Sequence, residues 1–158
     1  MHCSATKEGK NFQIEDVRNW HIWPKDYFED GQYKYTKYKG KVYQNRKLLP
    51  EEVRGLHGNG WSDIGYHYVI LLDGTVKEGK KEQQRGAHTK GYNKDSIGIC
   101  YIGGLDENGN PKDTRTPEQK DSMIKLLVKL KQKYMDAELC GHYQFSSKAC
   151  PSFKIEDL

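Results

Sequence analysis

Residues 141–152 read Gly141-His142-Tyr143-Gln144-Phe145-Ser146-Ser147-Lys148-Ala149-Cys150-Pro151-Ser152, and this stretch decides how the chain must fold. It holds an imidazole and a thiol eight positions apart, and both are ligands that Zn²⁺ prefers. A catalytic zinc takes three protein ligands and keeps one position open for water, so a third ligand must come from elsewhere. The best remaining candidate is His2, at the other end of the chain. The sequence therefore predicts a fold that brings both ends together around one zinc ion.

Lys148, two residues before Cys150, adds a positive charge to this predicted site. An ammonium group so close favours the thiolate and can face an anionic transition state. The chain contains no His-Glu-x-x-His motif, so the glutamate base of that class of metalloprotease is missing. The water at this site must therefore be activated in another way.

The composition is that of one well-solvated domain: 158 residues, a charged fraction of 30% and a net charge of +4. The lysines are spread along the chain rather than massed, so we interpret the positive excess as a solvated surface and expect no nucleic-acid partner. No run approaches the roughly 18 apolar residues of a membrane span, and no secretion signal is visible. We therefore expect no membrane partner, and we expect a monomer.

Hydrophobic patterning predicts helices at 11–23 and from Pro117 to about Tyr134, the second with a capping box that begins at Thr116. It also predicts strands, which cover residues 64–72, 75–78, 96–102 and, as a short piece, 138–140. The first two of these strands form a hairpin through Asp73-Gly74. The tyrosine-rich residues 32–44 predict a second hairpin, in which the rings either pack on the body or stack on a ligand.

The four cysteines are Cys3, Cys100, Cys140 and Cys150. An even number is compatible with two disulfides in a secreted protein, but the chain is not cysteine-dense and shows no export signal. We interpret Cys150 as a metal ligand and the other three as free thiols.

Two further regions carry candidate functional residues. Tyr66 follows a glycine at the start of the best strand, where its phenol could orient water or bind an oxyanion. Spacing alone favours a simpler interpretation, in which Tyr66 and Tyr68 anchor one face of the sheet and His67 is a packed histidine. His88 lies in a polar loop flanked by glycines and is either a substrate donor or a fourth ligand.

Four blocks, taken together, resemble a known family. They are His-Cys-Ser-Ala-Thr at 2–6, Gly-Trp…Asp-Ile-Gly-Tyr-His-Tyr at 60–68, Gly-Ala-His-Thr-Lys-Gly-Tyr-Asn…Ser-Ile-Gly-Ile-Cys at 86–100, and His142…Lys-Ala-Cys-Pro-Ser-Phe at 148–153. In this order they resemble the zinc N-acetylmuramoyl-L-alanine amidases of the phage-lysozyme type, relatives of the peptidoglycan recognition proteins. The resemblance spans the chain except for about residues 22–58, which look like an insertion in a single amidase-like domain.

The resemblance implies an α/β fold with a mixed central β-sheet flanked by helices. It implies hydrolysis of the amide between the lactyl group of N-acetylmuramic acid and L-alanine in peptidoglycan. The implied roles are zinc binding by His2, His142 and Cys150, catalytic assistance by Tyr66 and Lys148, and muropeptide binding by His88 and Asn93. A phage-lysozyme-like enzyme is expected to stay in the cytoplasm until it is released, or to act at the cell wall.

One feature departs from that family, in which an apolar strand leads into the first histidine. Only Met1 precedes His2 here, and such a terminus is expected to fray unless metal and neighbours hold it. The alternative function is therefore a muropeptide-binding module without catalysis. A further alternative is a regulatory role through protein contacts of the tyrosine-rich residues 32–43.

Overall fold

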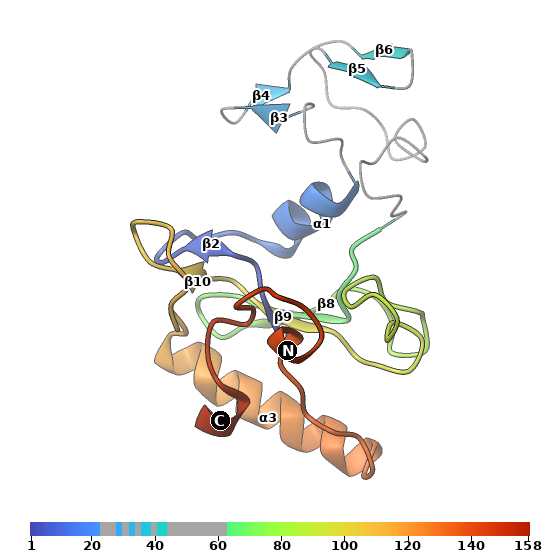
Figure 1. The fold of residues 1–158 in the computed structure, drawn as a ribbon, viewed down its shortest axis with the longest axis vertical. Helices are drawn as coiled ribbons and strands as arrows, with labels where there is room; N and C mark the ends of the chain where they lie inside the picture. Colours follow the sequence, from blue (N-terminus) through green and yellow to red (C-terminus); the bar gives the residue numbers. More distant parts are fainter. Residues whose placement is uncertain (23–27, 30–31, 34–35, 39–40, 44–62) are drawn as a thin grey trace. The chain divides into compact units, whose positions relative to one another are not determined.

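The computed structural model of the 158-residue chain describes residues 1–22, 28–29, 32–33, 36–38, 41–43 and 63–158 (Figure 1). The chain divides into two units, each described here by itself. One unit combines residues 1–14 with residues 66–158, and the other comprises residues 15–65. Both chain ends belong to the first unit.

The first unit is built on a four-stranded sheet with the order β1-β9-β7-β8. These strands are β1 (His2–Cys3), β9 (Ile99–Tyr101), β7 (Tyr68–Ile70) and β8 (Val76–Glu78). β1 and β7 both run parallel to β9, whereas β7 and β8 form the predicted antiparallel hairpin. The sheet is therefore mixed, as expected. β7 and β9 are shielded on both faces, because Val69, Ile70 and Cys100 are fully buried.

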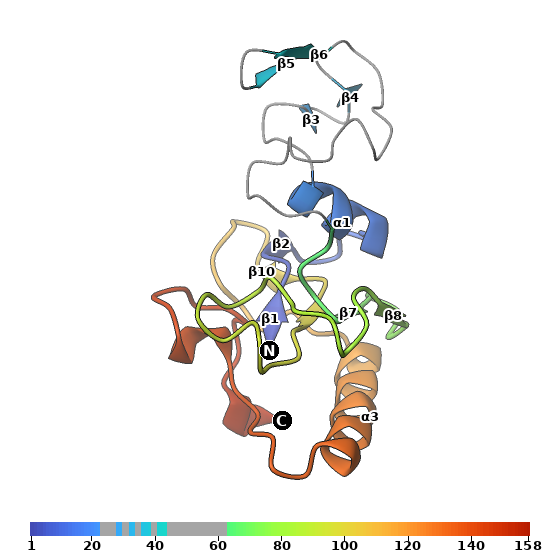
Figure 2. The same ribbon diagram turned by 90° about the vertical axis from the view of Figure 1, so that its right-hand side faces the viewer.

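Helix α3 (Pro117–Lys133) packs against β7, and Figure 2 shows it beside the β7–β8 hairpin. The predicted capping box is present: the Thr116 side chain accepts from the Gln119 amide, and the Gln119 side chain accepts from the Thr116 amide. The side-chain Nε2 of the buried Gln119 also donates to the backbone carbonyls of Ile70 and Ile102. One residue thus starts the helix and fixes it to β7 and to the residue that follows β9. The apolar face of the helix then covers the sheet through Met123, Leu126 and Leu130.

The remaining strands of this unit, β2 (Thr6–Lys7) and β10 (Gly104–Leu105), form a short parallel pair. Two 3-10 helices follow α3, η2 (His142–Gln144) and η3 (Ile155–Asp157). The strand expected at 138–140 is wrong. The Met1 amine donates to the Cys140 carbonyl and the His142 amide donates to the Met1 carbonyl, so this segment bonds to the chain start without forming a strand.

The second unit contains α1 (Ile14–Ile22) except for its first residue, and this helix is shorter than the one expected at 11–23. It also contains β5 (Thr36–Tyr38) paired with β6 (Lys41–Tyr43), which confirms the tyrosine-rich hairpin with a first strand shorter than expected. An additional antiparallel pair, β3 (Phe28–Glu29) and β4 (Gln32–Tyr33), was not expected. Most of the predicted insertion at 22–58 lies outside the described residues, and it stays a prediction. Among the helices of the described residues, none has the length and apolar character needed to cross a membrane.

Candidate metal centre and adjoining groove

His2 lies in a paired strand and not in a frayed end. It opposes Cys100 in the parallel ladder of β1 and β9, and its exposed fraction is 3%. The residue before it is fixed on both sides, because Met1 bonds to Cys140 through its amine and to His142 through its carbonyl. Neighbouring segments therefore hold this terminus, which is the condition under which it was not expected to fray: backbone pairing on two sides keeps the imidazole in place.

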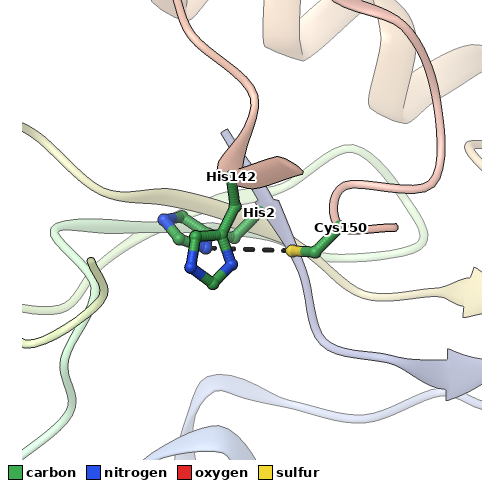
Figure 3. Close-up of side chains that lie close together, drawn as sticks. All are labelled: His2, His142 and Cys150. Atoms are coloured by element: carbon green, nitrogen blue, oxygen red, sulfur yellow. Dashed lines mark hydrogen bonds between the residues drawn. The ribbon is translucent and has the colours of Figure 1, made fainter. Parts of the chain in front are cut away.

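The three predicted ligands converge at one point (Figure 3). One potential ligand atom from each of His2, His142 and Cys150 lies within 4.8 Å of the other two. The Cys150 Sγ atom is 3.8 Å from His2 Nδ1, and the two imidazole ring centroids are 4.6 Å apart. In a tetrahedral zinc site, bond lengths near 2.0–2.1 and 2.3 Å separate a nitrogen and a sulfur ligand by about 3.6 Å. The donor types and their spacing thus fit Zn²⁺.

Cys150 is held by Cys3, which the sequence did not single out. The Cys3 amide donates to Cys150 Sγ over 3.3 Å, and the Cys150 thiol lies 4.0 Å from the Cys3 carbonyl oxygen. Interaction with the Cys3 side chain, together with burial, raises the pKa of the Cys150 thiol. Cys3, Cys100 and Cys140 are free thiols, as expected, and Cys150 forms no disulfide. The signal for Cys3 was its place beside His2, which puts its backbone amide next to the ligand cluster.

Tyr66 reaches the cluster, with its ring centroid 5.2 Å from that of His2. Burial raises the pKa of its phenol well above its ordinary value, so the hydroxyl keeps its proton. Tyr68 has a different environment, because its hydroxyl donates to Glu82. Tyr66 precedes β7, and the interpretation that both tyrosines anchor one face of the sheet stays a prediction.

Lys148 is exposed and lies on the loop between the two C-terminal ligands. Burial lowers the pKa of the His142 imidazole, and the positive charge of Lys148 lowers it further. The structure thus places this ammonium group within electrostatic reach of His142.

His88 and Asn93 were both expected at a substrate groove, but their side chains make different contacts. His88 Nδ1 lies 3.2 Å from His2 Nε2, so this imidazole contacts the cluster directly. The Asn93 side-chain oxygen accepts from the amides of His88 and Thr89, at 2.7 and 2.8 Å. Asn93 therefore fixes the loop that carries His88. Thr89, which the sequence did not single out, places its hydroxyl 3.4 Å from His2 Nε2.

A groove of about 850 Å³ adjoins the cluster. His2, His88 and His142 line it together with residues of α3 and of the segment that follows α3. Its other walls combine apolar and acidic side chains, among them Ile97, Leu127, Leu130, Glu82 and Asp136. A groove with an apolar floor and a few polar groups at one end is typical of a binding site for an extended ligand.

Comparison with known families now gives this arrangement a context. A family model described as N-acetylmuramoyl-L-alanine amidase matches residues 25–153. The chain belongs to this amidase family. The endolysin of Klebsiella phage KP32 is 35% identical over 156 residues, which cover 99% of this chain and 80% of the phage protein.

Solved structures agree with this family assignment. The amidase LysC from Clostridium intestinale URNW is 33% identical and has a TM-score of 0.56, covering 70% of this chain and 73% of its own. Bumblebee PGRP-SA is 26% identical with a TM-score of 0.60, covering 95% and 71%. The resemblance inferred from the four blocks is confirmed, as are the α/β fold with a mixed sheet and the enzyme class, a cell-wall lytic amidase. His142 and Cys150 fall inside the matched residues, whereas His2 precedes them.

Proposed function

We propose that this amidase is zinc-dependent and cleaves the amide between the lactyl group of N-acetylmuramic acid and L-alanine in peptidoglycan. The observation that carries the proposal is the convergence of His2, His142 and Cys150 from the two ends of the chain. Two imidazoles and one thiolate leave one tetrahedral position open, which is the ligand count of a catalytic zinc. When bound, zinc supplies a Lewis acid and lowers the pKa of a water ligand toward ~7.

The chain's own residues hold the reacting groups around that open position. Tyr66 keeps its proton, so its phenol can donate a hydrogen bond to the oxyanion that forms from the lactyl carbonyl. Lys148 supplies a positive charge on the loop side, where it favours the same anionic transition state. A single donor of this kind typically contributes ~3–4 kcal/mol to transition-state stabilisation.

The groove beside the cluster is the proposed binding site of the muropeptide. His88 lines it, and Asn93 contributes indirectly because its side chain fixes the loop backbone. The apolar wall of α3 and the acidic groups near it would contact the stem peptide. We also propose that the enzyme, like the phage endolysins that it resembles, reaches the wall after release from the cytoplasm.

Metal analysis combined with wall digestion tests this function. Purified protein is expected to hold about one zinc per chain and to release new L-alanine amino termini from peptidoglycan, with loss of both after chelation. Release of reducing sugar ends would instead indicate a glycosidase and contradict the proposal. Binding to muropeptides without any new amino termini, in zinc-loaded protein, would show the binding module that is the alternative.

A further inference from the structure

The two ring nitrogens of His2 face different partners. Nδ1 lies 3.8 Å from Cys150 Sγ, on the side of the three converging ligands. Nε2 lies 3.2 Å from His88 Nδ1. If Nδ1 gives its lone pair to a metal, Nε2 must carry the proton of the neutral ring, and that proton needs an acceptor. His88 Nδ1 is the nitrogen placed to accept it.

Two glycines make room for the His88 ring. A Cβ atom built on Gly86 or on Gly98 would lie 2.5 Å from His88 Cδ2, closer than side chains approach one another. The His67 ring stands edge-on behind His88, with the two centroids 5.8 Å apart. The backbone thus forms a slot whose shape is that of this imidazole.

The back wall of that slot is itself fixed. His67 Nδ1 accepts from the Gly98 amide over 2.9 Å, and its Nε2 donates to the Gln84 carbonyl over 2.9 Å. The Asn93 side chain holds the backbone at His88 through the amide hydrogen bond. These contacts leave the His88 ring little freedom to turn away from His2.

We propose that His88 is a positioning residue for the metal site. It accepts the Nε2 proton of His2 and so selects the tautomer that presents Nδ1 to zinc. The Thr89 hydroxyl, 3.2 Å from His88 Nδ1 and 3.4 Å from His2 Nε2, completes the polar contact. Groups that orient a ligand histidine in this way typically change metal affinity 10- to 100-fold when they are removed. The inference rests on the zinc-dependent function proposed above.

A role in packing alone fits the observations less well. Accepting at Nδ1 leaves the proton of His88 on Nε2, an atom that is buried and has no hydrogen-bond partner among the described residues. An unpaired buried donor is unfavourable, and an apolar ring of similar size would avoid it. The feature of this imidazole that packing does not explain is therefore Nδ1, the nitrogen that faces His2.

The test measures zinc affinity by competition with a chromophoric chelator, for the parent and for three variants of the full chain. His88→Ala is expected to weaken zinc binding about 10- to 100-fold. His88→Asn keeps an acceptor oxygen near the position of Nδ1 and is expected to recover most of that loss. Lys90→Ala, an exposed change on the same loop, is the matched control and is expected to bind zinc like the parent.

A nitrogen NMR measurement on the zinc-loaded parent keeps the test independent of any folding defect in the variants. The expected signature is a protonated Nε2 and a metallated Nδ1 at His2. A protonated Nδ1 at His2, or His88→Ala protein that binds zinc as tightly as the parent, would overturn the positioning role. Failure of the proposed function is a separate result, since the parent itself would then bind no zinc.

Discussion

The two sides of the metal cluster are built differently. On the strand side, His2 is 3% exposed, sits in β1 and has its ring against His88 and Thr89. On the loop side, His142 lies on η2 and is only half-buried. Within the described part of the chain, its ring makes no hydrogen bond. Sites on strands are held more closely than sites on loops. The protein itself therefore holds the imidazole of the strand side more closely than the imidazole of the loop side.

The largest expected effect comes from removing the one sulfur ligand on the loop side. Cys150→Ala should reduce bound zinc from about one per chain to none and abolish wall hydrolysis, because two imidazoles alone hold zinc weakly. Metal analysis after gel filtration checks this. Cys140→Ser is the matched control, since Cys140 lies outside the cluster. Full zinc content in the Cys150 variant would contradict the ligand set.

Next in size is the loss of the loop-side cation. Lys148→Ala should retain zinc but lower kcat about 10²- to 10³-fold, the usual cost of one oxyanion donor. Steady-state hydrolysis of a soluble muropeptide measures this loss. Lys129→Ala, which removes an exposed charge from α3, serves as control and should leave kcat unchanged. A Lys148 variant as active as the parent would show that this ammonium takes no part in the reaction.

Sequence reasoning succeeded where the signals were local. Thr116 and Gln119 predicted the start of α3 because a capping box depends on residues three apart. Asp73-Gly74 predicted the β7–β8 turn because this turn signal is also local. In the structure Gly74 has a φ of +80° and packs against the start of α3. The ligand types and the family blocks likewise predicted that His2, His142 and Cys150 lie together.

Sequence reasoning was less accurate where the local structure depends on contacts between distant segments. Residues 138–140 were expected to form a strand, yet Cys140 bonds instead to Met1 at the other end of the chain, a contact that no local pattern reveals. The strand expected at 64–72 covers only Tyr68–Ile70, so Tyr66 lies before it. The substrate role of Asn93 stays a prediction, and no sequence pattern revealed that its side-chain oxygen accepts from the backbone of its own loop.

A smaller loss of zinc affinity is expected from a change on the strand side. Gly98→Ala should displace the His88 ring and weaken zinc binding roughly 10-fold, since the added Cβ would lie 2.5 Å from His88 Cδ2. The same change in a His88→Ala background should cost almost nothing more, because the ring that it displaces is gone. Chelator competition on the single and double variants measures both. Additive losses would contradict a shared mechanism.

The smallest expected effect is a pKa shift on the loop side. Lys148 lowers the pKa of His142, so Lys148→Met should raise that pKa toward its ordinary value of 6.5 and extend protonation of His142 to higher pH. Burial lowers the pKa of His88 to about 4, and this value should not respond to the change. NMR titration of the zinc-free protein follows both rings. Equal shifts at His88 and His142 would contradict the separation of the two sides.

The central claim is that one zinc ion is held jointly by the strand side and the loop side. A crystal structure of the zinc-loaded enzyme tests it most directly. We predict a single ion bound by His2 and His142 at about 2.0–2.1 Å and by Cys150 at about 2.3 Å, with the fourth position open to solvent. An ion bound without His2, or an ion at another place in the chain, would contradict the account.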